Sequence, residues 1–373
     1  MVAPAISQKV FVMNHFSVPS ASSYYASPSA VMEPMVRASA TAGMEDLTAK
    51  LMEIKSWLAD DLLSLEKDIA QKAPDGADLA SQAAAHLRCQ PGKRVRPLCV
   101  VLAARAGGQE MNQTVRDFAV ASELVHTATL LHDDVLDEGD YRRGADAARV
   151  VYGNSASVLG GDFLLIDSLR RVQRTGHMDL LASLMNVIDL MVKAEALQLE
   201  RRNQFVPDRD AYHRIIYGKT AAIFRWGLRA GATAGGLNET AVDAYGRYGV
   251  MIGLAFQIVD DILDLAGDPL VTGKAVLTDV QEGKLTWPLI LACERDPEVE
   301  RLLREVALSN QPLSLDDSAR IRKKILATGC LEDTRVRARQ LGDEALLALE
   351  YTPVGRARDA LATVVETVVN RGL

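Results

Sequence analysis

Residues 123–144, ELVHTATLLHDDVLDEGDYRRG, join an apolar run to a dense group of charges. The run ELVHTATLL belongs to a stretch with helical spacing, and residues 130–144 contain five acidic side chains and two adjacent arginines. A helix that is apolar on nearly every face belongs in the centre of a helical bundle. Acidic groups at its C-terminal end oppose the helix dipole and cost stability unless a cation offsets them. We therefore predict that this buried helix ends at a cation-binding site.

The composition of the whole chain favours helix over sheet. Of its 373 residues, 48% are hydrophobic, 24% are charged and only 5% are aromatic, and no alternation of Val, Ile and Thr between turns recurs. We expect an all-α protein that forms one large bundle, because no linker is long enough to divide two domains. The expected helices span residues 45 to about 73, 96–106, 113–136, 155–172, 179–202, 208–230 and 239–265, with shorter helices after them.

Charge and cysteine content exclude several classes of protein. The net charge is −7 and the basic residues are scattered or paired with acids, which argues against a nucleic-acid partner. The four cysteines, Cys89, Cys99, Cys293 and Cys330, are far apart and form no CxxC pair, so buried free thiols are favoured over a zinc site or disulfides. No apolar run reaches the ~18 residues that span a bilayer, and we expect no transmembrane segment.

Residues 1–44 differ in composition from the rest of the chain. The first forty residues contain eight serines and a single acidic residue, Glu33. This composition is typical of an organelle transit peptide, but it fits a disordered or wrongly assigned start equally well, and both alternatives stay open. We expect residues 45–373 to form the folded domain. The protein is expected in the cytoplasm, or in a plastid or mitochondrion if residues 1–44 are a transit peptide.

Two groups of three aspartates follow the two most apolar expected helices. We define the first aspartate trio as Asp133, Asp134 and Asp137, and the second aspartate trio, in FQIVDDILD, as Asp260, Asp261 and Asp264. Residues four apart on a helix lie about 40° apart around its axis and about 6 Å along it, so the outer aspartates of each trio share a face. A lone trio is common on a solvated helix end. Two trios 127 residues apart (260 minus 133) favour metal binding, and carboxylate oxygens favour Mg²⁺, with Mn²⁺ as the alternative.

Basic residues supply the other part of an anion site. Lys93 and Arg96 lie at the start of an expected helix, where backbone amides and the helix dipole also favour anions. Further candidates are Arg142, Arg143, Lys219, Lys274 and Lys284. Taken singly, each of these residues fits an ordinary surface charge. Together with the two aspartate trios they predict two phosphate pockets, one bridged by metal and one formed by Arg and Lys alone.

The motifs resemble a known family. The segments GKRVRP, LLHDDVLDEGDYRRG, GDFLL, YGKTAA, FQIVDDILDLAGD and EGKLTWP occur in an order and spacing similar to those of the trans-isoprenyl diphosphate synthases, or polyprenyl synthetases, from about residue 50 to the C-terminus. The resemblance implies the all-α isoprenoid synthase fold around a central cavity, with residues 45–373 as the catalytic domain. It also implies an enzyme that joins an allylic diphosphate to isopentenyl diphosphate, a homodimer, and transient membrane contact when product is released.

The resemblance also implies roles for particular residues. The implied metal ligands are Asp133, Asp137, Asp260 and Asp264, and the implied catalytic residues are Asp133, Asp137, Asp260, Lys219 and Gln257. Isopentenyl diphosphate would bind Lys93, Arg96, His126 and Arg143, and the allylic diphosphate would bind Arg142, Lys219, Lys274 and Lys284. Thr220 and Gln257 would face the allylic cation. Two motifs depart from the family pattern. GKAVLTD replaces GKPxGxD, with Ala275 and Leu277 at the changed positions, and KAEALQ replaces EGExxQ.

Product length is predicted from the residues just before the first aspartate trio. Positions four and five before Asp133 are Thr129 and Ala128, both small, so the resemblance implies a deep apolar tunnel and a product of at least about twenty carbons. Phe163, Ile166 and Met185 are candidates for the end of that tunnel. Two alternatives stay open: a non-catalytic subunit of a heteromeric prenyl synthase, and a class I terpene cyclase.

Overall fold

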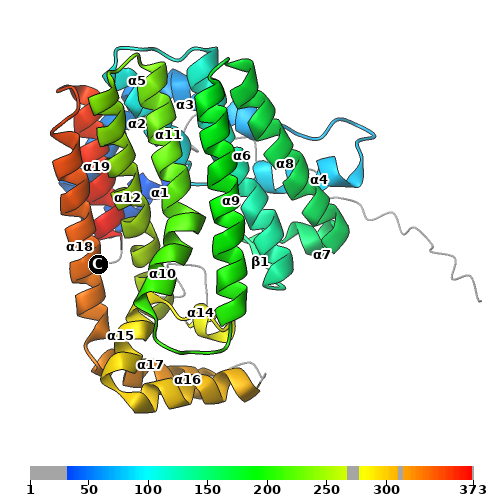
Figure 1. The fold of residues 1–373 in the computed structure, drawn as a ribbon, viewed down its shortest axis with the longest axis vertical. Coiled ribbons are helices and arrows are strands. Elements are labelled where there is room, and N and C mark those ends of the chain that lie inside the picture. The colour runs from blue at the N-terminus through cyan, green and yellow to red at the C-terminus, as the bar shows by residue number, and fades with distance from the viewer. Residues whose placement is uncertain (1–31, 267–276, 310–313, 372–373) are drawn as a thin grey trace, which may run out of the picture.

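The computed structural model describes residues 32–266, 277–309 and 314–371, and these residues are almost entirely helical (Figure 1). The helices are α1 Glu33–Thr41, α2 Glu45–Trp57, α3 Ala59–Ile69, α4 Leu79–Arg88, α5 Val95–Ala106, α6 Gln113–Leu136, α7 Ala148–Tyr152, α8 Asn154–Arg174, α9 Met178–Arg201, α10 Arg209–Ile216, the π-helical turn η2 Tyr217–Ala221, α11 Ala222–Ala234, α12 Glu239–Ala266, α14 Thr278–Gln281, α15 Trp287–Arg295, α16 Pro297–Ser309, α17 Leu315–Ala327, α18 Cys330–Leu349 and α19 Arg356–Asn370. The predicted all-α fold is confirmed.

Helices α6 and α12 form the centre of the bundle, as their apolar sequences predict. Helix α6 packs against α5, α8 and α11, and α12 packs against α11, α18 and α19. Their main axes run side by side with α9 and α11 in Figure 1. Helix α6 begins where predicted because the Asn112 side chain caps it, accepting a hydrogen bond from Val115 N at 2.9 Å. It ends before Glu138, whose φ of 53° is left-handed.

The structure corrects two of the predicted helices. The predicted helix 45 to about 73 is two helices, because Leu58 leaves helical geometry with ψ 16° between α2 and α3. The predicted helix 208–230 is divided into α10, η2 and α11, and the last of these continues to Ala234. Helices α4 and α7 were not predicted. Helix α4 has only ten residues, and its one clear local signal is Asp78, which caps it by accepting from Ser81 N.

The π-helical turn η2 is packed closely from both sides. Gly218 lies against α9, where an added Cβ would come within 2.6 Å of the Ala194 Cβ and 2.7 Å of the Leu190 carbonyl oxygen. On the other side, a Cβ on Gly253 of α12 would come within 2.6 Å of the Ala221 Cα. Glycines therefore allow α9 and α12 to pack directly against η2. Single π-helical turns within helices are frequent at functional sites, and this one carries two of the predicted site residues, Lys219 and Thr220.

A short hairpin follows α6. Strands β1 (Tyr141–Arg142) and β2 (Ala145–Asp146) pair antiparallel, and the turn residues Arg143 and Gly144 have φ values of 52° and 80°. Positive φ at both central residues is the type I′ arrangement, whose twist suits a two-residue hairpin. The hairpin carries the two predicted arginines: Arg142 pairs with Asp134 of α6, and Arg143 donates to the Gln90 carbonyl before α5.

Residues 33–41 of the expected N-terminal extension form α1, which packs against α2. Residues 1–31 lie outside the described residues, so the interpretation of the extension stays a prediction. The four cysteines carry free thiols, as expected, and three of them are buried. Across the described parts of the chain, none of the helices combines the length and the apolar character needed to cross a bilayer.

Candidate active site

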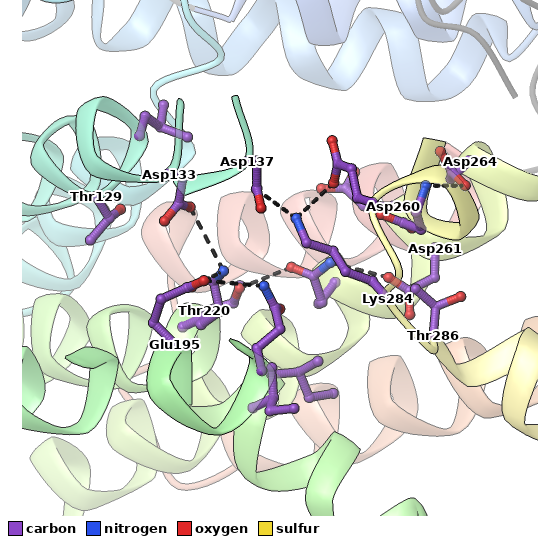
Figure 2. Close-up of a pocket in the computed structure, with 18 of the residues that line it drawn as sticks. Thr129, Asp133, Asp137, Glu195, Thr220, Asp260, Asp261, Asp264, Lys284 and Thr286 are labelled. Carbon is purple, nitrogen blue, oxygen red and sulfur yellow. Dashed lines mark hydrogen bonds and ion pairs between the residues drawn. The ribbon is translucent and has the colours of Figure 1, made fainter. Parts of the chain in front are cut away.

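One large cavity, about 1200 Å³ in volume, opens between α5, α6, α9, α10 and α12. Its lining brings together five of the six trio aspartates, all but Asp134, and most of the predicted basic residues: Lys93, Arg96, His126, Asp133, Asp137, Arg142, Arg143, Lys219, Thr220, Gln257, Asp260, Asp261, Asp264 and Lys284. Figure 2 shows the aspartates entering this space from opposite helices. Lys274 lies outside the described residues, so its position in the site stays a prediction.

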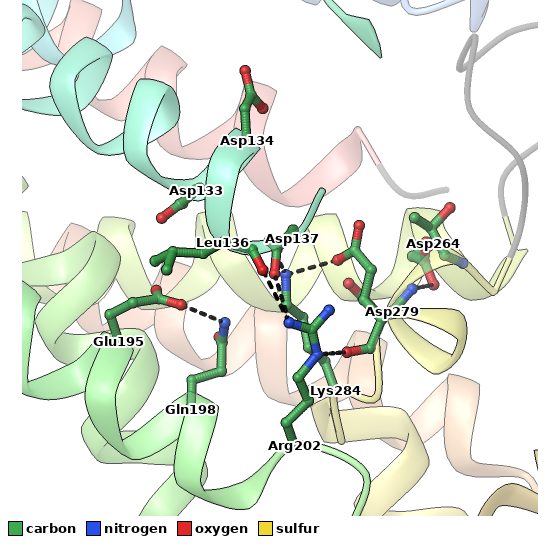
Figure 3. Close-up of polar contacts among 12 residues, drawn as sticks. Asp133, Asp134, Leu136, Asp137, Glu195, Gln198, Arg202, Asp264, Asp279 and Lys284 are labelled. Carbon is green, nitrogen blue, oxygen red and sulfur yellow. Dashed lines mark hydrogen bonds and ion pairs between the residues drawn. The ribbon is translucent and has the colours of Figure 1, made fainter. Parts of the chain in front are cut away.

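The first aspartate trio divides between the cavity and the protein. Asp133 and Asp137 line the cavity, as the spacing of four predicts, while Asp134 points away from them (Figure 3). The buried Asp134 accepts hydrogen bonds from Arg142 at 2.8 Å and 2.5 Å. This ion pair anchors the hairpin to α6, so Arg142 reaches the cavity already paired with a carboxylate.

The second aspartate trio divides in a similar way. Asp260 lines the cavity and pairs with Arg371, at 2.9 Å between Oδ1 and Nη2. Asp264 accepts from the backbone N–H groups of Thr278 and Asp279 at 3.1 Å and 3.3 Å, so it also orders the start of α14. Burial raises the pKa of Asp264 to about 6. Asp264 therefore has a structural task beside any role as a metal ligand.

Asp261 is enclosed by hydrogen-bond donors. Its oxygens accept from Tyr212 Oη at 2.5 Å, from Gln257 Nε2 at 3.1 Å and from Trp287 N at 3.3 Å. Burial, with a further contribution from the Asp279 charge, raises the pKa of Asp261 to about 8. The three donors oppose that rise, because hydrogen bonds to a carboxylate favour its ionised form.

Two lysines neutralise the cavity side of the first trio. Lys284 Nζ lies 2.7 Å from Asp137 Oδ2, and Lys219 Nζ lies 3.7 Å from Asp133 Oδ2 and contacts Glu195. Burial raises the pKa of Asp133 to about 6, although Lys219 opposes the rise. Each lysine therefore lies between carboxylates, where a bound diphosphate would compete for it.

The carboxylates suit an ion that takes only part of its ligands from protein. Within residues 32–266, 277–309 and 314–371, no three His, Cys, Asp or Glu side chains lie close enough together to enclose an ion. The assignment of Asp133, Asp137, Asp260 and Asp264 as metal ligands stays a prediction. Mg²⁺ keeps several waters and binds through one or two carboxylates plus substrate phosphates. The buried Asp137 Oδ1, which accepts no hydrogen bond from the described residues, fits that kind of partial coordination.

The basic residues predicted for isopentenyl diphosphate, Lys93, Arg96 and Arg143, line the same cavity as His126. Burial lowers the pKa of His126 well below its ordinary value, and the charges of Arg96 and Arg143 lower it further. The guanidinium of Arg96 lies 4.8 Å from the centre of the Phe224 ring, and its Nε has no hydrogen-bond partner among the described residues. A neutral imidazole beside crowded arginines is the arrangement expected of an anion pocket.

Similarity to known proteins agrees with this site. Residues 77–325 match the family model described as "Polyprenyl synthetase". The octaprenyl diphosphate synthase of Escherichia coli is 36% identical over 327 residues, which cover 86% of this chain and 99% of that protein. This chain belongs to the polyprenyl synthetase family. Enzymes of this family are prenyltransferases, and prenyl diphosphate synthases generally use a divalent metal.

Solved structures of polyprenyl synthetases share the fold. The crystal structure of a decaprenyl diphosphate synthase from Rhodobacter capsulatus has a TM-score of 0.78 at 35% identity and covers 86% of this chain and 98% of that one. A polyprenyl synthase from Caulobacter crescentus, crystallised with calcium and isoprenyl diphosphate, has a TM-score of 0.76 at 33% identity and covers 91% of this chain and 97% of that one. The isoprenoid synthase fold implied by the motifs is confirmed.

The apolar part of the cavity differs in detail from the prediction. Thr129 lines the cavity, but Ala128 is fully buried and does not line it. The proposed tunnel ends Phe163, Ile166 and Met185 are wrong, because these side chains are 42%, 49% and 55% exposed on the outside of α8 and α9. Leu165, Ile188 and Met191 line the apolar wall instead. Neighbouring positions on a helix point about 100° apart, and the sequence periodicity did not identify which of them faces the cavity.

Arg94 is a buried residue beside the site, and the sequence motifs predicted no role for it. It lies between the two predicted ligands Lys93 and Arg96, has a left-handed φ of 48°, and is almost fully buried. Its guanidinium donates to both Glu66 oxygens at 3.1 Å and to Glu123 Oε1 at 2.8 Å. The ion pairs join α3, the α5 start and α6. The sequence signal was the second of the three basic residues in GKRVRP, whose partner carboxylates are distant along the chain.

Proposed function

We propose that this protein is a Mg²⁺-dependent trans-polyprenyl diphosphate synthase. It joins an allylic diphosphate to isopentenyl diphosphate and repeats the reaction to make an all-trans product of at least about twenty carbons. The observation that carries the proposal is one cavity with aspartates from α6 and α12 at its polar end, two separate groups of cations beside them, and an apolar wall further in. A diphosphate with a hydrocarbon tail matches all three surfaces.

Asp133, Asp137 and Asp260 would hold the magnesium ions, and Asp264 is a further candidate that also orders α14. The metal neutralises charge on the departing pyrophosphate. Lys219, Lys284 and Arg142 bind the allylic diphosphate beside those aspartates, together with Lys274. Because Lys219 and Lys284 start between carboxylates, they exchange a carboxylate partner for phosphate oxygens when substrate binds. That exchange keeps the cavity close to neutral.

Lys93, Arg96, His126 and Arg143 bind isopentenyl diphosphate. A lowered pKa keeps the His126 ring neutral, so it donates one hydrogen bond to an anion without adding to the crowded positive charge. Thr220 and Gln257 present oxygens to the allylic carbon as its bond to oxygen breaks, and their partial negative charges stabilise the cation.

Product length depends on the apolar wall. Thr129, Leu165, Ile188 and Met191 leave room for a tail beyond the polar end. Several relatives are named for long products, among them an all-trans-nonaprenyl diphosphate synthase of Rhodobacter capsulatus that is 32% identical over 320 residues, 86% of this chain and 97% of that protein. We propose a long-chain product for this enzyme as well.

A second copy of the chain is the proposed partner of the outer face of α8 and α9. Leu159, Phe163 and Ile166 recur at helical spacing along α8, and Met178 and Met185 do so along α9, all at least 42% exposed. Contiguous exposed apolar side chains mark interaction sites. Analytical ultracentrifugation should show a dimer, and Phe163→Glu combined with Ile166→Glu should shift it to monomer. A monomeric wild-type protein contradicts this part of the proposal.

The reaction itself is tested with purified protein, Mg²⁺, radiolabelled isopentenyl diphosphate and farnesyl diphosphate. We expect labelled, chain-extended diphosphates that chromatography resolves by length. A cyclised hydrocarbon would instead identify a terpene cyclase. If the protein is inactive alone and extends the substrate only after a second, different chain is added, it is a subunit of a heteromeric synthase.

A further inference from the structure

Four side chains of the cavity lining form one chain of hydrogen bonds. Tyr212 Oη donates to Asp261 Oδ2 at 2.5 Å, and Gln257 Nε2 donates to Asp261 Oδ1 at 3.1 Å. Gln257 Oε1 in turn accepts from Thr220 Oγ1 at 3.0 Å. Figure 2 shows part of this chain, from Asp261 to Thr220. Gln257 and Thr220, at its end, are the two residues whose oxygens face the allylic carbon in the proposed function.

Asp261 is placed differently from the other aspartates of its trio. It is 2% exposed, and its oxygens are occupied by Tyr212, by Gln257 and by the backbone N–H of Trp287. The Asp260 side chain, by contrast, is 37% exposed, and it shares its charge with Arg371. A carboxylate that is enclosed by three donors acts as a hydrogen-bond acceptor inside the protein. It offers little to an ion in the cavity.

This acceptor decides which way the Gln257 amide points. Asp261 Oδ1 accepts from Gln257 Nε2 and Gln257 Oε1 accepts from Thr220 Oγ1, so the amide nitrogen of Gln257 faces Asp261 and the amide oxygen faces Thr220. The Thr220 hydroxyl then has to donate to that oxygen, which leaves its own lone pairs on the cavity side. Both oxygens are thereby fixed before any substrate enters.

We propose that Tyr212 and Asp261 are positioning residues for prenyl transfer. They act through Gln257 and Thr220, and they hold two partially negative oxygens where the allylic carbon becomes electron-poor. The inference rests on the proposed function. Preorganised dipoles are effective because they do not reorient during the reaction, and partners behind a functional side chain commonly fix its orientation.

The neighbourhood of Thr220 supports this assignment. Lys219 precedes it in the same π-helical turn and lies beside Asp133 and Glu195 at the polar end. The turn therefore places a diphosphate-binding cation and a cation-stabilising oxygen on adjacent residues.

Tyr212→Phe tests the hydroxyl group alone. The Tyr212 ring packs against Trp287, with ring centres 5.4 Å apart, and phenylalanine keeps that packing. We expect kcat to fall about tenfold, the loss of one hydrogen bond to a charged group, while the KM of isopentenyl diphosphate and of farnesyl diphosphate stays within about twofold. An unchanged kcat overturns the inference.

Tyr248→Phe is the matched control. Tyr248 is also fully buried, and its hydroxyl donates to the Leu361 carbonyl at 2.9 Å, away from the cavity. Both variants lose one buried hydrogen bond, so their melting temperatures should fall by similar amounts. Only Tyr212→Phe should lose kcat. Equal losses of kcat in the two variants would identify a general stability effect and overturn the inference.

Asp261→Asn separates positioning from metal binding. Asparagine keeps the shape but places a donor against either Tyr212 or Gln257, so kcat should fall by at least about tenfold. The affinity of Mg²⁺ in the presence of inorganic pyrophosphate, measured by calorimetry, should stay within about twofold. A large loss of that affinity would make Asp261 a metal ligand and overturn its assignment here.

An inert wild-type enzyme would refute the proposed function and this inference together, whereas an active wild type with a fully active Tyr212→Phe variant refutes only the inference.

Discussion

The ammonium group of Lys284 lies 2.7 Å from Asp137 Oδ2 and thereby joins the end of α6 to the segment after α14, 147 residues away (Figure 3). The same nitrogen lies 2.7 Å from Glu282 Oε2. Burial lowers the pKa of Lys284, but the two carboxylates outweigh that effect and raise its pKa above the ordinary value. The lysine therefore stays charged and holds the first aspartate trio in a neutralised state until a diphosphate competes for it.

Replacing Lys284 by Met should weaken binding of the allylic substrate. The change removes a cation from the proposed diphosphate pocket and leaves Asp137 and Glu282 to repel the incoming phosphates. We expect the KM of farnesyl diphosphate to rise about tenfold or more. Lys193→Met is the control, since Lys193 is on the surface and paired only with Asp189. Equal KM values in the two variants would remove Lys284 from the pocket.

Removing single carboxylates should weaken metal binding. Asp133→Asn and Asp260→Asn each take away one charged oxygen ligand, so the Mg²⁺ concentration that gives half-maximal activity should rise about tenfold. Excess EDTA should abolish condensation by the wild type, and added Mg²⁺ should restore it. Asp189→Asn, an exposed aspartate on α9, should leave the metal requirement unchanged. Wild-type activity that persists in EDTA would refute the metal proposal.

Replacing Arg94 by Met should destabilise the fold. It leaves Glu66 and Glu123 buried without their shared cation, which costs about 3–5 kcal/mol. Urea unfolding followed by circular dichroism measures that loss. Arg301→Met removes an exposed arginine that pairs with Glu298 and Glu305, and it should cost less than about 1 kcal/mol. Similar losses would show that the buried ion pairs contribute no more than surface ones.

The contribution of His126 to stability should fall as the pH drops below about 6.5. Burial and neighbouring arginines lower the pKa of His126 in the folded protein, whereas the unfolded imidazole takes up a proton near pH 6.5. Below that pH the unfolded state binds more protons, so the free energy of unfolding decreases. His126→Gln removes this titration, so the free energy of unfolding of the wild type minus that of the variant, measured by urea unfolding, should decrease from about pH 8 to about pH 5.5. Parallel curves for variant and wild type would contradict the folded-state pKa direction.

A bulky residue at position 129 should shorten the product. Thr129 lines the cavity, so Thr129→Phe narrows the apolar part, and chromatography should show shorter prenyl chains. Ala128 is fully buried outside the cavity lining, so Ala128→Phe should instead overpack the core and cost about 1–3 kcal/mol. A shorter product from Ala128→Phe with normal stability would place the tail on the other side of α6.

Local patterns in the chain determined the helices and the facing of the outer aspartates. Apolar spacing and a cap such as Asn112 act within one or two turns, so the predicted bounds of α6 match the structure and those of α12 differ by one residue. Asp133 and Asp137 share a face because helical geometry fixes residues four apart, whatever surrounds them. The order of the motifs was likewise enough to indicate the polyprenyl synthetase family.

Only the tertiary structure decided which charged groups meet. Nothing near Asp261 in the sequence indicates that it accepts a hydrogen bond from Tyr212, 49 residues away. The partners of Arg94 and Lys284 come from distant helices, and the π-helical turn at Lys219 depends on close contact with Gly218 and Gly253. Such pairings depend on how whole helices pack. An unpaired buried charge is costly, so each buried charge needs an opposite charge that lies close to it in the folded protein.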